Sequence, residues 1–308
     1  MSQPLRIEDC QQVNLLTSRT QNSRLWFVNN KRLETEILGS LAKYQERHGV
    51  ALYAFALQGN HDHLSARFPR GNRAPFMRDL NAQIARLAIR LVNGLGRGKY
   101  WERRYAHQEL PRNEDIEEYF FYCALQTVLS GLAEHPSEYP GYNSFDDAVN
   151  GRECEYTVTD WTRYNNARRW NAKVDITRYQ STHKLVYQRL PGYEHLSQEA
   201  YRDLMYKKLE ERRLAIVAER KKAGKGFLGQ KALKNVKPGA RPRVTKTSTR
   251  SSHRPLVLSA CQETKQHCLE RYFCTLDRYK QASIRYLKGE ITVRFPTGTY
   301  RPPMLCAA

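Results

Sequence analysis

The feature that most constrains the fold is a nearly continuous apolar run, "VALYAFALQG" at residues 50–59, with "DHLSARFP" at residues 62–69 close behind it. A short apolar run bounded by turn residues is typical of a buried strand, and the second run alternates as a half-buried strand does. Gly59 and Asn60 form a turn dipeptide between the two. The sequence therefore predicts an antiparallel strand pair, whose apolar surface needs a cover of helices.

Further elements flank this pair in the order β-α-β-β-α-(β)-α. "VNLLTSRT" at residues 13–20 predicts a first strand, and residues 96–110 form a basic aromatic segment that ends in another. Three helices are predicted from apolar spacing and from a glycine near each end, at residues 30–49, 74–94 and 113–132. This order predicts an α+β domain over residues 1–150, with a ferredoxin- or RRM-like antiparallel sheet and helices on one face.

The second half of the chain is more polar and more basic. Residues 197–224 predict a strongly charged helix, and residues 262–289 predict a last one. The stretch between them is rich in Gly, Pro, Ser and Thr, as linkers are. The expected divisions are an accessory helical region at 151–224, a basic flexible linker at 225–255 and a C-terminal helical and strand extension at 256–308.

The charge of the chain favours a polyanionic partner. The 308 residues carry a formal net charge of +20, with a pI of about 9.7. Residues 202–254 alone hold 17 Lys or Arg and 4 Asp or Glu. A field of this sign attracts nucleic acid, although a basic tail that serves only solubility is the simpler alternative for the C-terminal part.

Composition also bears on location. The chain has no run of eighteen apolar residues, so no membrane partner is expected. Its N-terminus lacks the basic and then apolar pattern of an export signal. None of the seven cysteines forms Cys-x-x-Cys, which favours a reduced, cytoplasmic setting.

Two motifs carry the candidate chemistry. His61 and His63 stand two apart on a predicted strand, so their imidazoles point to the same side. Tyr122 and Gln126 stand four apart on a predicted helix, so they share a face. Two imidazoles and an amide oxygen suit Mg²⁺ or Mn²⁺, and a phenol one turn away is a candidate nucleophile. The simpler alternatives are surface histidines beside a turn and a tyrosine of the core.

A wider set of motifs resembles a known family. "LYAFALQGNHDHLSARFP", "KYWERRYAHQEL" and "YFFYCALQTVLSGLAEHPSEYPGYNSF" are similar, in order and spacing over residues 13–150, to the single-strand HUH tyrosine transposases. The REP-associated tyrosine transposases are the branch that the sequence resembles most. The C-terminal "FPTGTY" also resembles the tail of longer members. The resemblance implies the HUH endonuclease fold, in bacteria and close to the nucleoid.

The resemblance also implies roles for individual residues. His61, His63 and Gln126 take the places of the metal ligands, and Tyr122 takes that of the nucleophile. The implied reaction is metal-assisted attack of Tyr122 on a phosphate of single-stranded DNA, hairpin or palindromic in form. It would leave a 5′-phosphotyrosine and a free 3′-OH in a monomer or homodimer.

The chain departs from the family pattern at two positions. Asp62 replaces an apolar residue between the histidines, and "QTV" at residues 126–128 replaces the commoner Asn-Pro-Val. These departures keep open a domesticated, inactive nucleic-acid-binding protein. An HUH replication initiator or relaxase, and an RNA-binding protein with a ferredoxin-like sheet, are further alternatives.

Nucleic-acid contacts are expected from two basic segments. Cations beside aromatic rings suit single strands, and a basic helix end suits phosphates. The expected contact residues are Arg97, Lys99, Tyr100, Trp101, Arg103, Arg104, Lys221, Lys222 and Lys225. An equally good interpretation of Trp101 is a side chain that packs in the core and holds this segment in place. The spacing of Cys261, His267, Cys268 and Cys274 fits no common zinc finger, so core or surface positions are expected for them.

Overall fold

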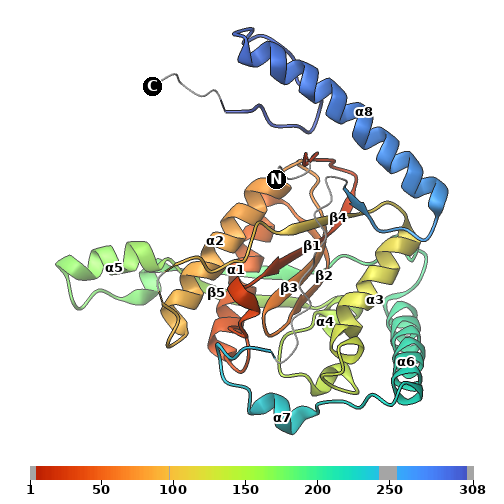
Figure 1. Cartoon of the computed structure of the whole chain (residues 1–308). Coiled ribbons are helices and arrows are strands. Elements are labelled where there is room, and N and C mark those ends of the chain that lie inside the picture. The colour runs from red at the N-terminus through yellow and green to blue at the C-terminus, as the bar shows by residue number, and fades with distance from the viewer. Residues whose placement is uncertain (1–4, 97, 243–254, 304–308) are drawn as a thin grey trace.

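The computed structural model describes residues 5–96, 98–242 and 255–303. Its centre is a five-stranded sheet in the order β2-β3-β1-β4-β7 (Figure 1). The strands of this sheet are β1 (Val13–Arg19), β2 (Ala51–Leu57), β3 (His61–Arg67), β4 (Ala106–Leu110) and β7 (Leu256–Val257).

The first four strands form an antiparallel sheet with the ferredoxin-like order. The chain runs β1-α1-β2-β3-α2-β4, and β1 lies between β3 and β4. The predicted strand pair is thus present. The short strand β7 joins the edge in parallel with β4, which makes the sheet mixed rather than purely antiparallel.

Helices α1 (Lys31–His48) and α2 (Arg73–Leu91) cover one face of the sheet. The Asn30 side chain accepts a hydrogen bond from the Leu33 backbone N–H at the start of α1. Gly49 ends the helix in the left-handed conformation, at φ 64°, where glycine has no steric penalty. Leu33, Ile37 and Leu41 are buried at helical spacing, so the apolar stripe of α1 faces the core.

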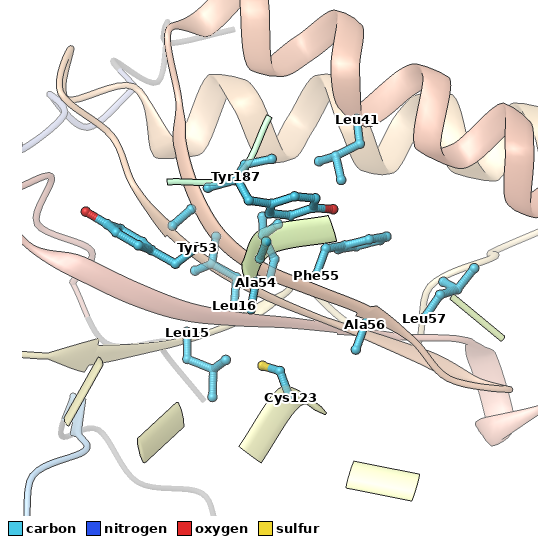
Figure 2. Packing of buried hydrophobic residues seen from close by; sticks show 14 of the residues in the cluster. Leu15, Leu16, Leu41, Tyr53, Ala54, Phe55, Ala56, Leu57, Cys123 and Tyr187 are labelled. Carbon is cyan, nitrogen blue, oxygen red and sulfur yellow. The ribbon is translucent and has the colours of Figure 1, made fainter. Parts of the chain in front are cut away.

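Helix α3 (Asn113–Leu129) covers the opposite face, so the expectation of helices on one face is wrong. Figure 2 shows Leu41 of α1 on one side of the sheet and Cys123 of α3 on the other, beside Leu15. The physical reason lies in β1, whose consecutive residues Leu15 and Leu16 are both fully buried and point to opposite faces. Each face is apolar and each needs a cover.

The sequence had suggested a helical region at residues 151–224, but the structure also has strands there. β5 (Glu153–Thr159) and β6 (Gln180–Val186) form a separate antiparallel pair that packs against α1. The other elements of this region are the short helix α4 (Phe145–Asn150), α5 (Trp161–Trp170) between β5 and β6, and the 3₁₀ turns Gln21–Ser23, Pro136–Glu138 and Ile176–Tyr179.

Three helices complete the fold: α6 (Gln198–Lys222), α7 (Gln230–Lys234) and α8 (Gln262–Leu287). Helix α6 packs against α3, where Lys208 Nζ lies 2.8 Å from a Glu117 carboxylate oxygen. No helix within the described ranges combines the length and apolar character that a membrane span requires.

The expected linker is partly ordered structure. Its described portion, residues 225–242, carries α7 and lies against the N-terminal domain. Asn29 Nδ2 donates to the Leu233 carbonyl at 2.9 Å, and the Leu25 N–H donates to the Ala240 carbonyl at 2.9 Å. These hydrogen bonds hold the described portion of the expected linker against the N-terminal domain. The rest of the linker, residues 243–254, lies outside the described residues.

A buried arginine joins the N-terminal segment to the sheet domain. Arg73 is 2 % exposed and donates to Asn14 Oδ1 and to the Ile7 carbonyl, both at 3.0 Å. The Glu8 carboxylate accepts the backbone N–H groups of Arg73 and Ala74 at 3.1 and 3.0 Å, so it caps α2 from outside the helix.

Replacing Arg73 with Met is expected to lower the free energy of unfolding by about 3–5 kcal/mol, because the Glu8 charge stays buried without its cation. Chemical denaturation measures this change. Arg78→Met is the matched control, since that side chain is on the same helix and 71 % exposed; its effect should stay within about 0.5 kcal/mol. Equal effects of the two substitutions would contradict the role of Arg73.

Candidate metal and nucleophile site

The register of β1 and β3 gathers the candidate residues on one face. Thr17 pairs with His63, and Arg19 pairs with His61. Because side chains alternate along a strand, these four residues point to the same side as Leu15, which is the side covered by α3. The two histidines are therefore presented together, as their spacing predicts.

The two imidazoles are close and oriented. Their ring centroids lie 4.8 Å apart at an interplanar angle of 89°. His61 Nδ1 hydrogen-bonds Asn60 Oδ1 at 2.7 Å, and His63 Nδ1 hydrogen-bonds the Thr17 hydroxyl at 2.9 Å. Since both Nδ1 atoms are engaged, the Nε2 atoms are the ones left to bind a metal, in the usual arrangement of metal-binding histidines.

Burial keeps both imidazoles neutral at physiological pH. It lowers the pKa of His63 to about 4 and that of His61 well below its ordinary value. The positive charge of Arg19 lowers both values further. Neutral imidazole is the form that binds a metal ion.

Helix α3 brings Tyr122 to this pair, and Gln126, one turn further along the helix, is hydrogen-bonded to Tyr122. The Tyr122 ring centroid lies 5.3 Å from that of His63, at 75°. His63 Nε2 and Gln126 Oε1 are both buried, and neither has a hydrogen-bond partner among the described residues. An unpaired buried polar atom is costly, and a divalent cation would satisfy both.

These residues fit a metal ion of the Mg²⁺ or Mn²⁺ class, with the imidazoles and the amide oxygen as ligands. The described part of the chain contains no group of three His, Cys, Asp or Glu side chains placed to hold a metal. A cation here would therefore depend on Gln126. Elsewhere, Cys268 is buried, Cys261 is half-buried, and Cys274 and His267 are exposed.

Tyr122 is not activated by its protein surroundings alone. Burial raises the pKa of its phenol, and the neighbouring Cys123 and Tyr119 raise it further. The hydrogen bond with Gln126 and the charge of Arg19 act in the opposite direction. The phenol is consequently protonated at neutral pH.

Arg19 is a site residue that the sequence motifs did not reveal. It stands opposite His61, and its charge acts on His61, His63 and Tyr122. The sequence did contain one signal for this role. Arg19 lies two residues after Thr17 in the predicted strand at residues 13–20, so the two side chains share a face. That spacing becomes informative only once β1 is paired with β3.

Asp62 points away from this site, to the face covered by α1 and α2. It is 3 % exposed, and its Oδ1 accepts the Ser18 backbone N–H at 3.3 Å. The Ser18 hydroxyl in turn donates to Asn81 Oδ1 at 3.2 Å. Burial raises the pKa of Asp62 to about 7, and Ser18 offsets part of this effect. The departure from the family pattern is thus accommodated by polar partners outside the site.

The basic aromatic segment contains exposed cations and aromatic rings that are buried or half-buried. Lys99, Arg103 and Arg104 are exposed, whereas Arg97 lies outside the described residues. Tyr100 is only 5 % exposed, and its ring centroid lies 4.9 Å from that of Trp101.

The half-buried Trp101 donates its indole N–H to the Asn81 carbonyl at 2.9 Å. Tyr100 and Trp101 therefore anchor the segment to the core, and the expectation that Tyr100 is a platform for bases is wrong.

The segment nevertheless lies beside the candidate site. The Glu102 N–H donates to the Arg19 carbonyl, and the Gln21 N–H donates to the Tyr100 carbonyl, both at 2.8 Å. The exposed cations therefore lie close in sequence to a segment that pairs with the end of β1.

The second expected group of cations lies at the end of α6, next to the end of α3. Lys221, Lys222 and Lys225 are exposed at the C-terminal end of α6. That end is held at the end of α3 by Arg220, whose Nη1 donates to the Leu129 carbonyl at 3.2 Å. Gln126 is in the last turn of the same helix.

The chain can be compared with known families, curated proteins and solved structures. No protein-family model matches the chain, and no curated protein matches it. A solved structure described as a REP-associated tyrosine transposase bound to a REP hairpin is similar at 18 % identity and a TM-score of 0.41. The likeness covers 48 % of this chain and 86 % of that one.

Asp62→Asn is expected to raise the free energy of unfolding by about 2–4 kcal/mol at about pH 8. The carboxyl has a pKa of 3.8 when unfolded and of about 7 when folded. Between these values the folded state keeps a proton that the unfolded state has lost, so wild-type stability falls as pH rises. The gain should be complete above about pH 7 and absent below about pH 4, as urea denaturation at several pH values would show.

Asp79→Asn is the matched control, and its effect on the free energy of unfolding should have the opposite sign. Burial raises the pKa of Asp79, but hydrogen bonds from Arg78 and His48 outweigh it and the net shift is downward. This substitution should lower stability near neutral pH. An Asp62→Asn protein whose gain is the same at all pH values would contradict the buried, proton-binding carboxyl.

Proposed function

We propose that this chain is a metal-dependent enzyme that nicks and rejoins single-stranded DNA, with Tyr122 as the nucleophile. The observation that carries the proposal is the pair of unpartnered buried atoms, His63 Nε2 and Gln126 Oε1, next to the Tyr122 ring. His61 supplies the third ligand. A ligand set without partners beside a phenol fits phosphate chemistry better than it fits a packed core.

The chemistry follows from these residues. Tyr122 Oη attacks the phosphorus, an oxygen–phosphorus bond forms, and the bond from phosphorus to the 3′ oxygen breaks. The phenolic proton is released to solvent, and the departing 3′ oxygen takes up a proton. A bound Mg²⁺ or Mn²⁺ supplies positive charge that withdraws electron density from the phosphate.

The product is a 5′-phosphotyrosine with a free 3′-OH, and the reverse attack rejoins the strand without ATP. Arg19 adds positive charge beside the reacting phosphate, and the enzyme's task is positioning and charge stabilisation.

The motif resemblance supports the finer assignment. We infer a transposase of the HUH tyrosine class that acts on hairpin or palindromic DNA, as a monomer or homodimer in the bacterial cytoplasm near the nucleoid. Exposed Lys99, Arg103 and Arg104 would contact phosphates next to the site, and the lysines at the end of α6 would add affinity that depends on salt.

A second candidate is DNA binding without cleavage. It is favoured by the raised pKa of Tyr122, which leaves the nucleophile protonated in the protein alone. The two candidates share the binding surface and differ only in whether a covalent adduct forms.

Tyr122→Phe is expected to abolish covalent protein–DNA adducts, a loss of at least about 1,000-fold in rate, while single-strand affinity stays within about threefold. Labelled hairpin-containing single strands with Mn²⁺ or Mg²⁺, resolved on denaturing gels, measure the adduct. Tyr119→Phe is the matched control, because its ring lies on the same helix 5.6 Å from that of Tyr122. Adducts that persist without the Tyr122 hydroxyl would sink the assignment, and wild-type protein without adducts would favour the binding-only alternative.

His63→Ala and Gln126→Ala are each expected to weaken Mn²⁺ binding by about 10- to 100-fold, because each removes a ligand. Calorimetric titration of the DNA-free protein measures this without reference to activity. His267→Ala, a change at an exposed histidine of α8, is the control. Wild-type Mn²⁺ affinity in the Gln126 variant would exclude the amide oxygen as a ligand.

A further inference from the structure

The hairpin of β5 and β6 carries a projecting arm. The arm consists of α5, the turn Ile176–Tyr179 and the residues between them, and it stands out from the body on the side away from α3 (Figure 1). The exposed cations of the arm are Arg163, Arg168, Arg169, Lys173 and Arg178.

None of these five side chains forms an ion pair or hydrogen bond with any residue in the described ranges. Some other surface cations of the protein are paired, as Arg212 is with Glu118 and Arg285 is with Glu290. Residues 161–179 hold five Lys or Arg and a single carboxylate, Asp175, so the arm differs from a solvated face on which carboxylates are interspersed.

Asp175 within the arm and Asp160 just before it are engaged as caps. Asp160 accepts the Arg163 backbone N–H at 3.0 Å, and Asp175 accepts the Thr177 N–H at 2.9 Å. These bonds hold the acidic groups against the backbone at the start of α5 and of the following turn. The outer surface of the arm is therefore left with its positive charges.

A basic cavity continues this surface at the base of the arm. It has a volume of about 420 Å³ and lies between α1, α2 and Trp161. Lys43, Arg86 and Arg90 line it, together with Asp160. Arg90 stacks on the Trp161 ring at 3.2 Å, which fixes the arm to α2.

The aromatic residues of the arm indicate whether this surface suits single-stranded or duplex nucleic acid. Tyr164 packs against Trp161 and Tyr179 at centroid distances of 6.1 and 5.9 Å, so these rings form the core of the arm. Single-strand sites offer exposed rings to the bases, whereas duplex binding relies on phosphates. Trp170, 93 % exposed at the end of α5, is the one large ring of the arm that is free within the described residues.

We propose that the arm, with the basic cavity at its base, binds the phosphate backbone of a DNA duplex. Helix α5 is about 15 Å long, which matches about four base pairs. The exposed Trp170 ring, at the end of this helix, would contact the same duplex. This surface is separate from the Tyr122 site, so the proposal does not rest on the proposed function.

The test is fluorescence anisotropy of the full chain with a labelled 20-base-pair DNA duplex and a labelled single strand of thymidines of equal length. In the triple variant Arg163→Gln, Arg168→Gln, Arg169→Gln, duplex affinity should fall at least about tenfold, and the slope of log affinity against log salt should be less steep by about 2.7. Single-strand affinity should change by less than about threefold. Trp170→Ser, which preserves charge, should weaken duplex binding alone.

The matched control is Arg278→Gln, Lys280→Gln, Lys288→Gln, which removes the same charge from exposed positions on and just after α8. Equal losses of duplex affinity in the two triple variants would overturn the proposal, because net charge alone would then explain binding. An equal loss for duplex and single strand in the arm variant would also overturn it and identify a single-strand surface. Thermal unfolding confirms that each variant is folded.

Discussion

The antiparallel register between β1 and β3 is the constraint on which the rest of the structure depends. It sets Thr17 against His63 and Arg19 against His61. Because a slip of one residue would move every side chain to the other face, this register decides that the imidazoles meet α3 while Asp62 meets the α2 side. The two faces then have different chemistry: one holds the candidate metal ligands and the other holds a buried carboxyl with hydroxyl and amide partners.

On the face covered by α3, two polar atoms of the candidate site are buried without hydrogen-bond partners among the described residues. His63 Nε2 and Gln126 Oε1 are orphaned there, and the His63 imidazole is held neutral. A protein core usually pairs its polar atoms, so such a cluster is a cost that a bound cation would relieve. The raised pKa of Tyr122 belongs to the same picture, because the protein alone does not activate the phenol.

Much of this site was predictable, since its parts are local. A spacing of two on a strand and of four on a helix puts His61 with His63 and Tyr122 with Gln126 whatever the rest of the chain does. Tyr100 was misjudged because the same aromatic residue suits a base platform and a core anchor, and only its neighbours distinguish the two. The arm was missed because β5 and β6, which pair across more than twenty residues, show weak periodicity.

The sequence by itself determined the strand and helix order of the first domain, the pairs of candidate ligands and the excess of positive charge, because periodicity and charge are local properties of the chain. Only the tertiary structure decided that helices cover both faces, that Arg19 joins the histidines, that Asp62 finds Ser18 and that five cations gather on a projecting arm. These outcomes depend on contacts between residues distant in sequence. Such contacts are set by the burial of apolar surface across the whole domain, which no short segment encodes.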